Sequence, residues 1–200
     1  SIQLRILRKL LRFTAFLTFP AMFGLSIVSH ELIVILLTER WAEAAALLRW
    51  VCIAGACLPI SSVFINLLVS QGRSDIYLWG SIALSVLMLP SMIAAASYGI
   101  GVMTVVYVIV HVVEAALWFW FVRRETGLTV ANLASDLSPY LLLSLALAAA
   151  TTVIASPIDS ICLRLVAKVI VMSAGYCLTL WVLRSEIFLE SVNYLFKRWK

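Results

Sequence analysis

Six long apolar runs separated by short polar segments dominate the pattern of hydrophobic and polar positions along the chain. About 20 consecutive apolar residues, at a rise of about 1.5 Å per helical residue, cross a hydrocarbon core of about 30 Å. The pattern therefore predicts an all-α integral membrane protein, a single bundle of six transmembrane helices. We place these helices at residues 13–37, 44–69, 76–97, 100–122, 140–155 and 161–183.

Prolines mark features within and beside these runs. Pro20 and Pro59 lie inside the first two runs, where a proline removes a backbone hydrogen bond and kinks a helix. Pro139 and Pro157 flank the fifth and shortest run, so we expect that helix to begin and end beside them.

Amphipathic segments stand at both ends of the chain. Residues 1–12 carry a basic stripe, with Leu4, Leu7 and Leu11 able to face lipid, and residues 184–200 mix aromatic with charged side chains. Both segments are typical of helices at the membrane interface, although the first could also be the end of a preceding helix. Because the sequence starts without a methionine, inside what looks like a helix already under way, we expect the C-terminal part of a larger membrane protein.

Composition excludes a soluble fold, because 64% of the residues are hydrophobic and only 12% are charged. A net charge of +5 would suggest nucleic acid as the partner of a soluble domain. In a membrane protein the same cations are topology signals, so we expect the lipid bilayer as partner and no nucleic acid. The four cysteines lie inside apolar runs without CxxC or zinc spacing, and we predict neither a metal site nor a cofactor.

The placement of lysine and arginine predicts the orientation of the bundle. One side of the membrane would receive nearly all of these residues, whereas the other would receive little more than Arg40. By the positive-inside rule the richer side is cytoplasmic, so both termini would face the cytoplasm. The connections at residues 39–43, 98–101 and 156–160 would then face outward. They are short, and the chain has no G-x-S-x-G, P-loop or HExxH motif, so we predict that it is not an enzyme.

Ionisable side chains inside the apolar runs are the main functional signal, because a charge near the bilayer centre costs about 2.5 to 3.5 kcal/mol. His111 and Glu114 are three residues apart and share one helix face with Tyr107 and Trp118. We interpret this pair as a proton-responsive or ion-coupling site near the middle of the membrane. The alternative is a structural polar pair between helices.

Two cations lie on one face of the last run. Arg164 is close enough to the outer surface to extend its head group into water. Lys168 lies about 10 Å inside and needs an acidic partner, an anionic ligand or a wet cavity.

A polar stripe formed by Ser62, Asn66 and Ser70 follows Pro59 and leads to Arg73. As a functional element, the stripe would line a cavity with a cation at its mouth to receive phosphate. Alternatively, Ser62 and Asn66 join helices and Arg73 is an orientation signal.

Arg49 lies toward the outer side of the second run, near His30 and Glu31 at the end of the first. We expect Arg49 to form a structural salt bridge with Glu31 or Glu43 across this helical hairpin.

The same hairpin resembles a known family. The order of motifs is P-x(3)-G at Pro20 to Gly24, L-L-T-E-R-W ending at Trp41, a mid-helix proline at Pro59, and S-Q-G-R from Ser70 to Arg73. Over residues 12–77 these features resemble the Wzx-type polysaccharide flippases of the multidrug/oligosaccharidyl-lipid/polysaccharide exporter superfamily. Thr38 departs from the pattern, since members commonly have glycine there, and we expect a different turn.

The resemblance implies a two-lobed protein of about twelve to fourteen helices, in which this chain would be the C-terminal part and an N-terminal lobe would be its partner. It implies transport of an undecaprenyl-pyrophosphate-linked oligosaccharide across the bacterial inner membrane by alternating access. A cavity that holds Lys168, Arg73, Arg49 and Asn66 would suit such an anionic substrate.

Two alternatives remain open. A cation-coupled multidrug antiporter of the same superfamily would use His111 and Glu114 to bind its coupling ion, with the basic residues incidental. A glycan polymerase would instead require a large outward catalytic loop outside this chain.

Overall fold

The computed structural model describes residues 2–182 and, over that range, consists of long α-helices with one short 3-10 helix. The elements are α1 (Ile2–Leu37), η1 (Glu39–Trp41), α2 (Ala44–Ser70), α3 (Ser74–Ala96), α4 (Ile100–Thr126), α5 (Val130–Ala155) and α6 (Ile161–Val182). Six of these helices are long and apolar enough to cross a membrane. The chain is therefore a multi-pass membrane protein, and the predicted all-α class with six helices that could span a membrane is confirmed over the described residues.

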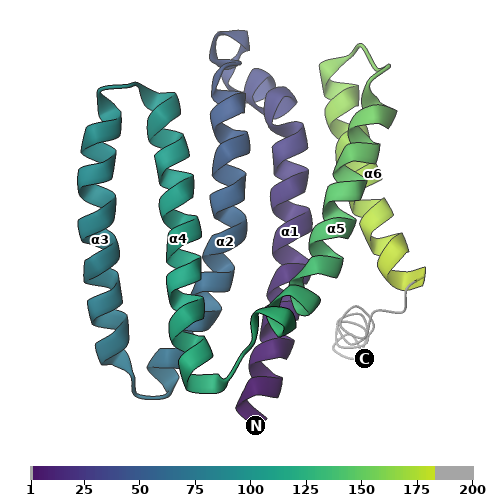
Figure 1. Ribbon diagram of the computed structural model, residues 1–200. Coiled ribbons are helices and arrows are strands. Elements are labelled where there is room, and N and C mark those ends of the chain that lie inside the picture. The colour runs from purple at the N-terminus through teal and green to yellow at the C-terminus, as the bar shows by residue number, and fades with distance from the viewer. Residues whose placement is uncertain (1, 183–200) are drawn as a thin grey trace, which may run out of the picture.

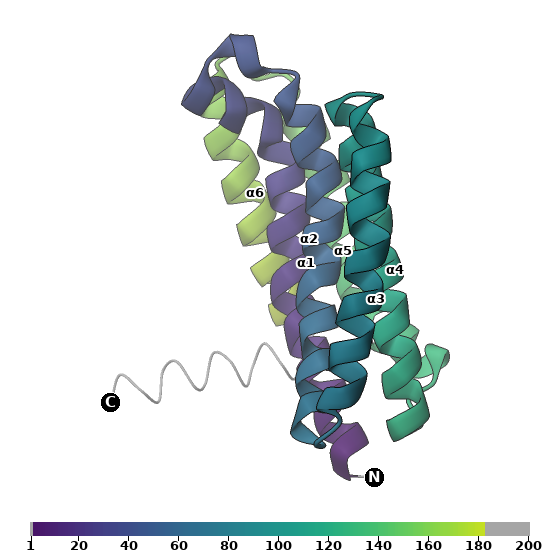
Figure 2. The same cartoon turned by 90° about the vertical axis from the view of Figure 1, so that its left-hand side faces the viewer.

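The helices run up and down, and successive connections alternate between the two ends of the bundle (Figure 1). α3, α4, α2 and α1 stand side by side in that order, and α5 crosses the lower part of α1 next to α6. In the side view the axes of α1 to α4 run in nearly the same direction (Figure 2). α1 packs against α2, α5 and α6, and so occupies the centre of the arrangement.

The connection that leaves α1 has an unusual backbone. Thr38 has a φ of 78°, in the left-handed region that a β-branched residue rarely adopts. Glycine reaches this region without steric penalty, so Thr38 adopts at some cost a conformation that suits glycine. The connection from α4 to α5 uses glycine for the same purpose, since Gly127 has a φ of 73° and its N–H closes the helix on the Arg123 carbonyl at 3.0 Å.

The start of α1 differs from the expectation. Residues 2–12 are the first turns of one continuous helix. Leu7 and Leu11 are buried in the core, so the expectation that they face lipid is wrong. The physical reason is that α5 packs against this part of α1 and covers the face that carries them.

α5 is also longer than predicted. It begins at Val130, ten residues before the predicted start at residue 140, and Pro139 lies inside it. Thr129 caps the helix, because its hydroxyl accepts the Asn132 N–H at 3.2 Å. The expectation that Pro139 marks the start of this helix is therefore wrong. The predicted interfacial tail, residues 184–200, and the end of the last span at residue 183 lie outside the described residues.

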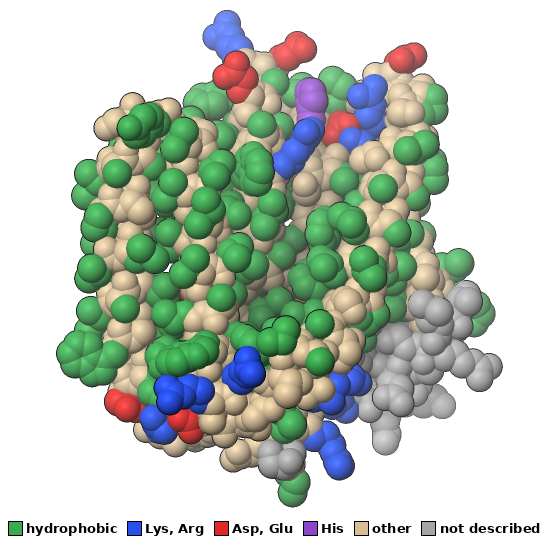
Figure 3. Space-filling model, in the orientation of Figure 1, with side chains coloured by type: hydrophobic (Ala, Val, Ile, Leu, Met, Phe, Trp, Pro, Cys, Tyr) green, Lys and Arg blue, Asp and Glu red, His purple; other side chains and the backbone are tan. Residues whose placement is uncertain are grey.

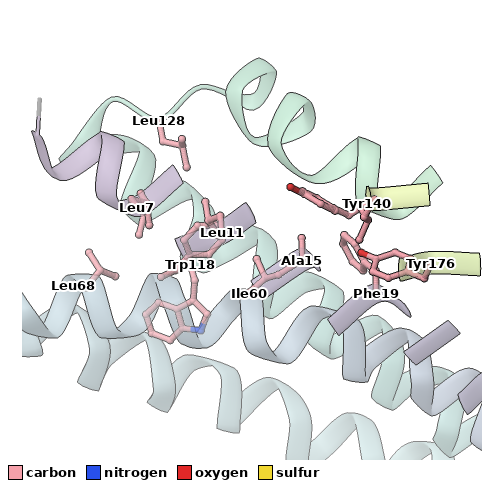
Figure 4. Packing of buried hydrophobic residues seen from close by; sticks show 13 residues of the cluster. Leu7, Leu11, Ala15, Phe19, Ile60, Leu68, Trp118, Leu128, Tyr140 and Tyr176 are labelled. Carbon is pink, nitrogen blue, oxygen red and sulfur yellow. The ribbon is translucent and has the colours of Figure 1, made fainter. Parts of the chain in front are cut away.

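A cluster of buried apolar side chains joins α1 to its neighbours. In Figure 4, Leu11 and Ala15 of α1 lie between Trp118 of α4 on one side and Tyr140 and Tyr176 of α5 and α6 on the other. Trp118 is the largest fully buried side chain, at 1% exposure. Neighbouring residues pack closely around the Trp118 ring, and a substitution that adds one atom beside the ring can test this packing.

Gly80 of α3 packs directly against the Trp118 ring. A Cβ atom added at Gly80 would lie 2.6 Å from Cη2 of Trp118. We expect Gly80→Ala to destabilise the protein by about 1 to 3 kcal/mol, because the added methyl group would overlap a ring that is buried. Gly101→Ala is the matched control, since an added Cβ there meets nothing within 4 Å. Thermal unfolding in detergent measures both, and equal midpoints for the two variants would contradict this packing.

Charged side chains gather at the two ends of the molecule, and hydrophobic side chains cover the zone between them (Figure 3). The end with the N-terminus and the α2–α3 and α4–α5 connections carries Arg5, Lys9, Arg73, Arg123 and Arg124. At the other end η1 carries Arg40, and Arg164 donates to the Ile158 carbonyl at 2.8 and 2.6 Å. Arg49 and Lys168 also lie in the half of the molecule that carries Arg40 and Arg164, so this end carries more cations than the sequence predicts. The cytoplasmic location of the first end remains a prediction.

Reporter fusions test that orientation. We expect green fluorescent protein fused after Arg124 to fluoresce in cells, because this position would be cytoplasmic. Alkaline phosphatase fused after Asp159 should be active, because that connection would face outward. The reverse pattern of fluorescence and phosphatase activity would show that the bundle is inserted the other way round.

Candidate functional site

A cavity of about 260 Å³ opens between α1, α2 and α5. Its wall is mostly apolar, with side chains such as Met22, Phe23 and Ile60. Among the described residues that line it, Arg49 alone is charged. The face of the molecule drawn in Figure 3 is hollowed in its middle, between the α2 side and the α5–α6 side.

Arg49 reaches this cavity without a carboxylate partner. Its Nε donates to Ser29 Oγ at 3.1 Å, and no salt bridge is formed by Arg49 within residues 2–182. The expected salt bridge with Glu31 or Glu43 is therefore wrong. The two remaining guanidinium nitrogens are left as donors on an exposed side chain that lines the cavity, and they could bond to an anion there.

Lys168 of α6 has the acidic partner that its depth requires. Its Nζ donates to Glu31 Oε1 at 2.5 Å and to the Ile27 carbonyl at 2.8 Å. Glu31 is only 4% exposed, and its second oxygen, Oε2, is buried without a hydrogen-bond partner. The pair ties α6 to α1 beside a second cavity of about 470 Å³ between these two helices. In this conformation the charge of Lys168 is neutralised.

The polar stripe of α2 lies outside both cavities. Ser62 and Ser70 donate to carbonyls of their own helix, at 3.0 and 2.7 Å, so neither joins α2 to another helix. Asn66 is exposed on the same helix. Arg73 stands at the end of the bundle, where its Nη1 donates to Glu125 Oε1 at 2.8 Å. The structure therefore does not bring Asn66 and Arg73 together with Arg49.

The predicted polar face of α4 is formed as expected. His111 Nδ1 lies 2.7 Å from Glu114 Oε2, and Trp118 Nε1 lies 3.4 Å from Glu114 Oε1. The Tyr107 ring meets the imidazole edge to face, with centroids 4.3 Å apart. His111 Nε2 is buried and has no partner. Glu114 also lies close enough to Cys57 of α2, which lines the first cavity, to interact with it electrostatically.

Sequence reasoning missed one charged cluster. Asp136 of α5 has a fully buried side chain, which accepts from Arg8 Nε at 2.6 Å, from Arg8 Nη2 at 3.0 Å and from Arg12 Nε at 2.5 Å. Asp136 was missed because α5 was expected to begin at residue 140. The signal was present, since Asp136, Tyr140 and Ser144 are spaced by four and all face the interior.

Parts of the chain are similar to known proteins of polysaccharide biosynthesis. Residues 3–46 match the family model described as "Polysaccharide biosynthesis protein". A region of 122 residues, 60% of this chain, is 25% identical to the lipopolysaccharide biosynthesis protein WzxC of Escherichia coli (strain K12), and it covers 25% of that protein's length. No solved structure matches the chain. The resemblance to Wzx-type proteins is thus confirmed as a distant relationship.

The buried pair of Lys168 and Glu31 makes a prediction about stability. Lys168→Met should destabilise the protein by about 3 kcal/mol, because it leaves an uncompensated carboxylate in an apolar interior. The double variant Glu31→Gln with Lys168→Met should regain most of this loss, since no charge then remains buried. Unfolding in mixed detergent micelles measures both variants. If the double variant were no more stable than Lys168→Met, the pair would not carry the coupling that its geometry indicates.

Proposed function

Because residues 3–46 match a polysaccharide biosynthesis family and 60% of the chain is related to WzxC, we propose that the chain is part of a flippase. The protein moves an undecaprenyl-pyrophosphate-linked oligosaccharide from the cytoplasmic to the outer leaflet of the bacterial inner membrane by alternating access. This chain supplies the C-terminal helices, and an N-terminal lobe of the same protein completes the central cavity.

The main support for the proposal is that Arg49 lines a cavity and has no carboxylate partner among the described residues. A pyrophosphate headgroup crossing the membrane loses its water shell and needs donors in exchange. A hydrogen bond between charged partners stabilises by about 1.5 to 3 kcal/mol, and the planar guanidinium can donate two such bonds to one phosphate. Arg49 has these donors, lines a cavity with an exposed side chain and has no carboxylate partner in the described part of the chain.

Lys168 and Arg73 would contact the substrate at other stages of transport. Lys168 contacts the headgroup only in a conformation in which Glu31 releases it, because the two are paired here at 2.5 Å. Arg73, together with Asn66 on the exposed stripe of α2, serves the opposite end of the path, where the substrate enters. Its pairing with Glu125 at 2.8 Å is exposed and therefore weak enough to exchange for a phosphate.

The multidrug antiporter is the second candidate. Its cavity would also be mainly apolar, as this one is, and His111 with Glu114 would bind the coupling ion. A cationic drug, however, would meet the positive charge of Arg49, which has no carboxylate partner among the described residues, and like charges repel. This charge favours an anionic substrate over a cationic one.

Substitution of Arg49 in the complete protein tests the proposal. Arg49→Ala should lower the rate of lipid-linked glycan export at least about tenfold, because about 1.4 kcal/mol of binding corresponds to a factor of ten. Arg49→Lys should retain part of the activity, since it keeps the charge but loses the two-point geometry. Arg40→Ala is the matched control, since Arg40 is exposed in η1 and does not line the cavity. Export by Arg49→Ala at the rate of Arg40→Ala would refute the assignment, and a loss of drug resistance with normal export would favour the antiporter.

A further inference from the structure

Arg8 and Arg12 of α1 share a single carboxylate, that of Asp136, where α5 crosses α1 (Figure 1). We propose that these two arginines bind the phosphate group of an anionic phospholipid in the adjoining leaflet of the bilayer. The proposal does not depend on the transport function, because none of the three residues lines the cavity that contains Arg49.

Asp136 fixes the two guanidinium groups side by side. Its side chain has no exposed surface, and it accepts from Arg8 Nε at 2.6 Å, from Arg8 Nη2 at 3.0 Å and from Arg12 Nε at 2.5 Å. Arg8 Nη2 and Arg12 Nε bond to the same oxygen atom, Oδ1. The two cations are therefore held close together in a defined arrangement.

The carboxylate neutralises only one of the two arginines. The two-point bond from Arg8 already satisfies the buried charge of Asp136, so that carboxylate does not require Arg12 as well. Two cations at such short range repel each other, and an anion that bonds to both of them offsets this repulsion. The cluster thus has a surplus positive charge that a phosphate group can neutralise.

Both arginines retain donors for a phosphate. Arg8 Nη1 and the two terminal nitrogens of Arg12 form no hydrogen bond within residues 2–182. The two side chains are 30% and 41% exposed, so a molecule beside the protein can reach these donors. Two other carboxylates at this end, those of Asp75 and Glu125, form their ion pairs with Arg73 instead.

The position of the cluster favours a lipid over a small soluble anion. Arg12 directly precedes the first apolar run, so it stands at the edge of the hydrocarbon zone, where the headgroup region begins. Exposed apolar side chains follow on the same two helices, with Phe13 and Leu17 on α1 and Leu142 on α5. Arg5, one turn earlier on α1, is exposed and adds to the attraction for an anionic membrane surface. A phospholipid combines the phosphate and the apolar chains that this surface accepts.

Native mass spectrometry of the complete protein, titrated with phosphatidylglycerol, tests the site. Arg12→Gln should weaken binding of the first lipid molecule about tenfold, because it removes a charged donor to the phosphate. Arg8 still pairs with Asp136 in this variant, so the buried carboxylate keeps a partner. Arg123→Gln is the matched control, since it removes an exposed charge at the same end of the molecule, in the last turn of α4. It should change the affinity less than about twofold, because solvent screens a distant charge.

Several results would overturn the proposal. The unsubstituted protein could bind zwitterionic phosphatidylcholine as tightly as phosphatidylglycerol, a comparison that needs no variant. Equal effects of Arg12→Gln and Arg123→Gln would show that the shared carboxylate does not create a site. Displacement of the lipid by inorganic phosphate would identify a site for the free anion. Displacement by undecaprenyl pyrophosphate that is lost in Arg12→Gln would identify a site for the transported lipid.

Arg49→Ala separates this inference from the proposed function. It should leave the affinity for phosphatidylglycerol unchanged, because Arg49 lies in the half of the molecule opposite to the cluster. Normal glycan export by Arg49→Ala would refute the flippase assignment without affecting the phospholipid site. A loss of phosphatidylglycerol binding in Arg49→Ala would instead place the lipid at Arg49 and overturn the site at Arg8 and Arg12.

Discussion

Ion pairs that each contain a buried carboxylate organise the helices around α1. Near one end of α1, Arg8 and Arg12 hold Asp136 of α5, and near the other end Glu31 holds Lys168 of α6. A buried carboxylate without a partner is costly, so each pair favours one helix next to α1 at one height along it. The Tyr176 hydroxyl, which donates to the Phe16 carbonyl at 2.8 Å, adds a third tie between α1 and α6.

This pairing also determines which cation remains available for a ligand. Glu31 is the carboxylate that the sequence suggested as a partner for Arg49, but in the structure one of its oxygens pairs with Lys168 of α6 and the other has no hydrogen-bond partner. α1 offers Arg49 only the hydroxyl of Ser29. Arg49 therefore keeps an unpaired positive charge beside the first cavity, a feature that suits the binding of an anion.

Hydropathy was sufficient to predict the class, the six spans and the polar face of His111 and Glu114, because these depend on the local sequence and the membrane imposes helices on every span. Pairings between distant helices could not be predicted in this way. Lys168 and Glu31 are 137 positions apart, and the sequence favoured the nearer partner, Arg49. The beginning of α5 was misplaced because Pro139 suggested a boundary, whereas a transmembrane helix tolerates an internal proline.

A structure of the complete protein in a lipid nanodisc with an undecaprenyl-pyrophosphate-linked sugar is the most direct test of this account. We expect a phosphate oxygen within hydrogen-bond distance of the Arg49 guanidinium, with Asp136 still held by Arg8 and Arg12. A headgroup bound away from Arg49, with the Arg49 side chain paired to a carboxylate, would contradict the account.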